Sequence, residues 1–240
     1  MAFDPQNQTV LRTGSRADSI SIDQGLRAHM LKVYNYMASG LALTGVVAMA
    51  TASSETMLNA IFGTPLSWVV MLAPLAFMLV LSFGINKLST TAAQGLFWAF
   101  ATVMGLSMAS IFLMYTGTSI ARVFFISAGM FAGMSLYGYT TKRDLSGFGS
   151  FLMMGLIGLI IAMVVNIFLQ SSALEFIISA AGVLIFVGLT AYDTQKIKSI
   201  YDEMDSHGVA TKKAIMGALT LYLDFINLFM MMLRLFGDRR

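Results

Sequence analysis

Seven long apolar runs limit, more than any other feature, what this chain can fold into. They cover residues 33–54, 66–85, 94–115, 120–139, 150–169, 174–193 and 214–236. Each run has about 20 residues, and at about 1.5 Å per residue a helix of that length crosses the hydrocarbon core of a bilayer. Only 11% of the residues are charged, whereas a soluble domain carries about 25%. The sequence therefore predicts an all-α, polytopic membrane protein with seven transmembrane helices.

Residues 1–28, which precede the first run, are polar and contain no apolar core segment. This composition is typical of a flexible tail and does not match a cleavable signal peptide. We therefore expect a flexible polar cytoplasmic tail over residues 1–28 and a seven-helix transmembrane domain over residues 29–240.

The positions of Lys and Arg predict the orientation. Most lie in the tail and in the loops after the second, fourth and sixth runs, whereas the other loops contain only Arg122. Basic loops stay in the cytoplasm, so we predict a cytoplasmic amino terminus and no nucleic-acid partner. Arg234, Arg239 and Arg240 disagree, because seven crossings place them outside. The alternative is a last segment that re-enters and returns, but residues 214–236 are long enough to cross.

Small residues are frequent inside the runs. Gly129 and Gly133 form a GxxxG pair, and Gly155 and Gly158 are similarly spaced in the next run. Small residues let helix backbones approach closely in lipid, so we interpret all four as packing positions.

Two acidic residues, Asp193 and Asp224, are placed inside membrane-spanning helices. A carboxylate there costs roughly 2.5–3.5 kcal/mol on insertion scales, so its default interpretation is functional. If the sixth helix continues to Ile200, Asp193 lies roughly 10 Å from its end, and Asp224 lies roughly 16 Å beyond Lys213 in the seventh. Because both depths are counted from the same side, the two carboxyl groups are predicted to meet between antiparallel helices.

Two carboxylates in contact cannot both ionise cheaply, so they would share a proton and titrate as a pair. Such a site responds to pH and attracts cations once both protons have left. The alternative is two separate, neutral, hydrogen-bonded aspartates. Tyr192 and Asn227 are candidate supporting residues, Asn227 because it lies one turn after Asp224. A local packing hydrogen bond is an equally good interpretation of Asn227.

The pair fits a transported ion better than a resident one. Ca²⁺ takes about six to eight oxygen ligands, and two carboxylates with Asn227, backbone carbonyls and water would support transient passage of Ca²⁺. The chain has no cysteine, so thiolate sites and disulfides are excluded. His29 and His207 lie outside the seven runs, which excludes an intramembrane bis-histidine haem. We therefore expect no cofactor, with Ca²⁺ as the transported ion at Asp193 and Asp224.

An intramembrane aspartyl protease is the enzymatic alternative, because those enzymes also place an aspartate in each of two adjacent helices. Tyr192-Asp193 resembles the first half of their signature. Their second aspartate follows Gly-x-Gly, whereas Asp224 follows Leu221-Tyr222-Leu223, and their Pro-Ala-Leu near the last helix is absent. We therefore predict that the protein is not an enzyme.

Three segments resemble the Bax inhibitor-1 (transmembrane Bax inhibitor motif) family, in its bacterial YccA-like branch. Residues 188–195, GLTAYDTQ, resemble the signature of the family. Residues 29–34, HMLKVY, resemble the start of its first helix, and residues 135–145, SLYGYTTKRDL, resemble its fourth-to-fifth connection. The resemblance extends over nearly the whole chain after residue 28.

The resemblance implies a fold in which six helices surround the seventh. It also implies that Asp193 and Asp224 are the di-aspartyl pair of a pH-sensitive Ca²⁺ leak, in which protonation switches the seventh helix between closed and open arrangements. In a member of the family, an arginine of the second helix latches onto the closed pair. Residues 66–85 contain no Arg or Lys, and only Asn86 and Lys87 stand near the end of that run.

We therefore expect a pH-sensitive calcium (cation) leak channel in a bacterial inner membrane, whose partners are the lipid bilayer, Ca²⁺ and protons. The alternative is a regulatory stress-survival membrane protein that acts by binding other membrane proteins. The polar tail motivates this alternative, because it has no part in the pore argument.

Overall fold

The computed structural model describes residues 5–240, with side chains from Asp23 onward. Its described residues form only helices and loops: α1 (Pro5–Ala52), α2 (Glu55–Phe62), α3 (Leu66–Gly84), α4 (Thr90–Met108), α5 (Ile111–Met114), α6 (Gly117–Thr140), α7 (Ser146–Leu169), α8 (Ser172–Ser199) and α9 (His207–Phe236). Seven candidate spans are long and apolar enough to cross a membrane, with α4 and α5 together forming one of them. The prediction of an all-α polytopic membrane protein with seven transmembrane helices is confirmed.

Hydroxyl side chains at the loop boundaries start most of these helices. The residues Ser54, Ser89, Thr116, Ser171 and Ser206 each accept a hydrogen bond from a backbone N–H in the first turn of the helix that follows. These caps satisfy donors that the helix itself leaves without a partner, so each loop ends where the sequence supplies an oxygen.

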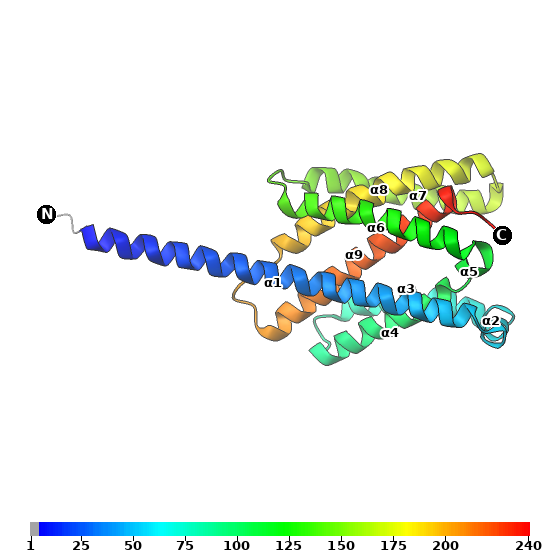
Figure 1. Cartoon of the computed structure of the whole chain (residues 1–240), viewed down its shortest axis with the longest axis horizontal. Coiled ribbons are helices and arrows are strands. Elements are labelled where there is room, and N and C mark those ends of the chain that lie inside the picture. Colours follow the sequence, from blue (N-terminus) through cyan, green and yellow to red (C-terminus); the bar gives the residue numbers. More distant parts are fainter. Residues whose placement is uncertain (1–4) are drawn as a thin grey trace.

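The helix α1 contains both the expected tail and the first expected span. Its backbone is helical from Pro5 to Ala52, so residue 28 marks no structural boundary. Figure 1 shows the amino-terminal part of α1 projecting beyond the other helices. His29 is buried in the bundle, with its ring centroid 5.7 Å from that of Tyr201. Residues 1–4 lie outside the described part, and the flexibility of the tail stays a prediction.

The helix α9 lies at the centre of the bundle. In its most apolar window 72% of the residues are buried, against 11–39% in the other six spans. It packs against α8, α1, α6, α4 and α3, whereas α7 packs on α8. The seventh span is therefore central, as expected.

The glycines at the closest helix contacts are not Gly129, Gly133 and Gly158. A Cβ atom added to Gly129, Gly133 or Gly158 would meet no atom within 4 Å, so the packing prediction for these three was wrong. A Cβ atom on Gly105 would lie 2.7 Å from the backbone oxygen of Thr44. One on Gly138 would overlap the backbone of Ala191, which brings α6 against α8 close to Asp193 along the chain.

The carboxyl terminus is held at the end of the bundle where α6 and α8 begin. Asp238 accepts a hydrogen bond from the backbone N–H of Thr116 (3.1 Å) and pairs with Arg122 (3.0 Å). Arg239 pairs with Glu175 at 2.9 Å. Because α9 is continuous from His207 to Phe236, the last candidate span does not turn back within the bundle. The opposite end, which carries Lys87, Arg143, Lys196 and Lys213, is called the basic end below.

Candidate functional site

The structure brings the two intramembrane carboxyl groups together. Asp193 comes from α8 and Asp224 from α9, which pack against each other, and the two side chains are hydrogen-bonding neighbours. Asp224 is only 6% exposed, and Asp193 is partly buried. The matched depth inferred from the helical rise therefore corresponds to a direct contact in the folded chain.

The hydrogen bonding of Asp224 depends on a proton. Its Oδ2 atom is buried and accepts no hydrogen bond from a donor among the described residues. An ionised carboxylate only accepts, so a bond to Asp193 forms only when one of the two carboxyls is protonated. Two bare carboxylates at this position would repel each other and leave a buried acceptor without a donor. The arrangement suits a pair that holds at least one proton.

The two candidate supporting residues point elsewhere. The Tyr192 ring packs against α7, where a Cβ atom on Gly149 would overlap it. The side chain of Asn227 donates to the backbone oxygen of Leu223 in its own helix, at 2.8 Å. This local hydrogen bond is the alternative that the sequence left open. Neither contact places a further ligand beside Asp193 and Asp224.

A lysine of α8, rather than a residue of α3, is the cation close to the pair. The ammonium group of Lys196, one turn after Asp193, interacts electrostatically with its carboxyl group. Its Nζ also lies 5.9 Å from the ring centroid of Tyr192. Lys87, which stands near the end of the second span, is exposed in the loop between α3 and α4. Spacing along one helix, Asp193 to Lys196, was a sequence signal that we did not use.

Buried hydroxyl groups join the helices around the pair, and sequence reasoning missed them. Tyr34 of α1 and Ser135 of α6 lie 2.6 Å apart through their hydroxyl oxygens, and Ser135 lies 2.9 Å from the hydroxyl of Thr194 in α8. Farther along α1, Thr44 bonds to Tyr222 of α9 at 2.7 Å. The only available signal was the presence of these polar side chains inside apolar runs.

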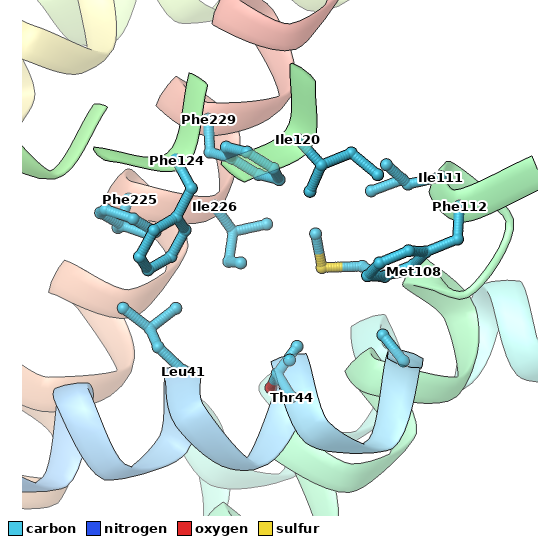
Figure 2. Close-up of a pocket in the computed structure, with 12 residues that line it drawn as sticks. Leu41, Thr44, Met108, Ile111, Phe112, Ile120, Phe124, Phe225, Ile226 and Phe229 are labelled. Carbon is cyan, nitrogen blue, oxygen red and sulfur yellow. The ribbon is translucent and has the colours of Figure 1, made fainter. Parts of the chain in front are cut away.

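An apolar cavity lies beyond Asp224, toward the end opposite the basic end. Figure 2 shows its lining, to which α1, α4, α5, α6 and α9 contribute Leu41, Thr44, Met108, Ile111, Phe112, Ile120, Phe124, Phe225, Ile226 and Phe229. Its volume is about 90 Å³. The hydroxyl of Thr44 already donates to the backbone of Ala101, at 2.8 Å. A water molecule needs about two to four polar partners, so a cavity with this lining stays dry.

The two carboxyl groups supply few ligands for a bound metal ion. Among the described residues, no group of three or more His, Cys, Asp or Glu side chains comes together. A resident Ca²⁺ ion would need about six to eight oxygens. Backbone carbonyls and water would have to supply most of them, which fits an ion that passes better than one that stays.

The chain is similar in sequence to several known bacterial proteins. A family model described as "Inhibitor of apoptosis-promoting Bax1" matches residues 26–240. An uncharacterized protein of Rickettsia prowazekii is 52% identical over 92% of this chain and 93% of its own length. The inner membrane protein YbhL of Escherichia coli K12 is 48% identical over 94% of this chain and 98% of its own length. An uncharacterized protein of Caulobacter vibrioides is 49% identical over 94% of both chains.

Proposed function

The chain belongs to the Bax inhibitor-1 family, and on this premise we propose that it is a pH-sensitive leak channel for Ca²⁺, gated by Asp193 and Asp224. The observation that carries the proposal is the contact between these carboxyl groups of α8 and α9. Oδ2 of Asp224 is buried there and accepts no hydrogen bond from a donor among the described residues. A shared proton holds the two helices together, and its loss creates a repulsive, cation-attracting site.

In the proposed closed state, two barriers stop the ion. The protonated pair carries too little negative charge to replace the hydration shell of Ca²⁺. Beyond it, the apolar cavity lined by Phe225, Ile226 and Phe229 has a single side-chain hydroxyl in its lining, that of Thr44, which is already bonded to Ala101 and Tyr222. Deprotonation drives Asp193 and Asp224 apart, and the accompanying shift of α9 opens the cavity to water. Lys196 favours the ionised state of Asp193, because opposite charges attract.

The test is Ca²⁺ flux into liposomes that contain the purified protein, followed over a series of pH values from acidic to alkaline. We expect flux to rise with pH, and both Asp193→Asn and Asp224→Asn to abolish that pH dependence. Asp144→Asn is the matched control, because Asp144 is exposed and hydrogen-bonded to Ser146, which lowers its pKa and keeps it ionised throughout. Absence of flux, or an unchanged pH profile in both intramembrane variants, rules out the mechanism.

We also propose that the protein lies in a bacterial inner membrane with the basic end in the cytoplasm, as the distribution of Lys and Arg indicates. The absence of cysteine makes labelling simple. A cysteine at Ser206, on the basic end, should react with a membrane-impermeant maleimide only after cells are opened. A cysteine at Thr118, on the opposite end, should react in intact spheroplasts. The reverse pattern would overturn the orientation.

The amino-terminal part of α1 favours a second candidate function. It projects beyond the bundle (Figure 1), where it is available to other proteins and contributes nothing to the carboxyl pair. The protein would then act by binding other membrane proteins. Deleting residues 2–22 leaves Gly25 and His29, which pack near Tyr201, in place. Loss of the cellular phenotype with normal Ca²⁺ flux would favour binding, whereas normal phenotype and flux would remove this candidate.

A further inference from the structure

A groove open to the bilayer separates α1 from α6. Two adjoining hollows form it, with volumes of about 560 and 520 Å³, and they share Phe131 as a lining residue. The first reaches from Arg27 and Tyr139 down to Phe131, and the second continues along α1 from Met37 to Met49. Figure 1 looks onto this face, with α9 visible between α1 and α6. We call both hollows together the α1–α6 groove.

The walls of the groove are apolar and face the lipid. Leu31 of α1 is 52% exposed and Leu136 of α6 is 63% exposed. The floor of the deeper hollow is reached by Phe225 of α9, the helix that carries Asp224. Because this surface lies within two membrane spans, whatever fills it must be apolar over most of its length.

The mouth of the groove, at the basic end, is positively charged. Arg27 lines it and forms no ion pair with any described residue. Lys198 of α8 lies at the same mouth, with Nζ 5.1 Å from the ring centroid of Tyr139 and 2.9 Å from the backbone oxygen of that residue. Two cations above an apolar slot complement an anion that carries a hydrocarbon chain.

The dimensions agree with such a molecule. From Arg27 to Met37 the helix α1 rises about 15 Å, which is half of the roughly 30 Å hydrocarbon core of a bilayer. A headgroup at Arg27 therefore places one acyl chain of the same leaflet along Leu31 and Tyr34, with its end near Phe131. A long arginine side chain reaches the phosphate level readily from this depth.

We propose that the α1–α6 groove is a binding site for one anionic glycerophospholipid, with its phosphate on Arg27 and an acyl chain between α1 and α6. The site belongs to the leaflet at the basic end. It requires neither proton transfer nor ion flux, so it stands apart from the proposed channel. Because its floor includes α9, the bound lipid lies against the helix that the channel proposal moves.

The experiment is native mass spectrometry of the full-length protein, first delipidated in detergent and then loaded from an equimolar mixture of phosphatidylglycerol and phosphatidylethanolamine. We expect one retained lipid per chain, with phosphatidylglycerol preferred. Arg27→Gln should lower that preference about fivefold, as expected for one basic side chain at a membrane surface. Ala132→Phe fills the groove wall and should remove the retained lipid of both classes.

Matched controls distinguish the site from general attraction. Arg143→Gln removes another exposed arginine at the basic end that does not line the groove, and Ala121→Phe adds the same ring to an exposed position of α6 outside it. Both should behave as wild type. Because Ala132→Phe risks misfolding, a phosphatidylglycerol with a diazirine on its acyl chain provides a wild-type readout, and it should label peptides of α1 and α6 above those of α3 and α7.

Three results would overturn the proposal. The first is an unchanged lipid preference in Arg27→Gln. The second is even labelling of all membrane-exposed helices. The third is a lipid-free dimer, which would show that a second copy of the chain covers the groove.

Discussion

At the scale of single residues, the site depends on where a few charged side chains lie, and not on a large number of them. Asp193 and Asp224 are in contact, Lys196 stands one turn away, and among the described residues no third acidic side chain joins them. The helical rise was enough to predict that the two carboxyl groups lie at a similar depth, because depth along a helix is fixed at about 1.5 Å per residue. The directions of Tyr192 and Asn227 were not predictable in this way, since they depend on how each helix is rotated.

Lys196 provides a prediction at this scale. In the proposed channel its charge favours ionised Asp193, so Lys196→Gln should stabilise the protonated, closed pair. The pH at which flux reaches half of its maximum should then rise, by less than about one pH unit because Lys196 is exposed and water screens its charge. Flux assays over a series of pH values measure this midpoint. Lys212→Gln removes a lysine from the first turns of α9 and should leave the midpoint unchanged. A lower midpoint in Lys196→Gln would contradict the role proposed for Lys196.

At the scale of the helices, glycines decide where backbones meet. A GxxxG spacing indicated close approach at Gly129 and Gly133, yet both face open space, and Gly105 and Gly138 make the close contacts instead. The spacing alone is the same on every face of a helix. Only the neighbour on a given side determines whether a missing side chain is needed there.

Two glycines of neighbouring helices should therefore respond oppositely to the same substitution. A Cβ atom at Gly45 of α1 meets nothing within 4 Å, so Gly45→Ala should raise the free energy of unfolding by about 0.5–1 kcal/mol, through helix propensity. At Gly105 of α4 the Cβ atom would lie 2.7 Å from the side chain of Val47 and the backbone oxygen of Thr44. Gly105→Ala should lower the free energy of unfolding by about 1–3 kcal/mol. Equilibrium unfolding in mixed micelles measures both, and equal shifts would contradict the packing described.

On the scale of the whole molecule, five helices line the cavity of about 90 Å³ that Figure 2 shows beyond the carboxyl pair. No single helix indicates its presence, because Leu41, Met108, Phe124 and Phe229 are ordinary apolar residues of their own segments. Its dryness arises only when α1, α4, α5, α6 and α9 come together and leave no free polar partner for water.

This cavity gives a prediction for the closed state. Ile226→Asn would introduce an amide that can hold water in the cavity, so Ca²⁺ flux at acidic pH should increase several-fold over wild type while the response to pH remains. Ile226→Leu keeps the lining apolar and should show no increase. A circular dichroism melt of each variant establishes that the bundle is intact. A low acidic flux in a folded, hydrated Ile226→Asn protein would place the ion barrier at the carboxyl pair alone.

The sequence by itself determined the number of crossings and the common depth of Asp193 and Asp224. These follow from hydropathy and from the fixed rise of a helix, which need no knowledge of neighbours. Only the tertiary structure decided which face of each helix points inward, and with it the contacts of Tyr192 and Gly138, the dry cavity and the α1–α6 groove. The physical reason is that lipid is as apolar as the protein interior, so a membrane-spanning sequence carries little signal that separates its buried face from its exposed one.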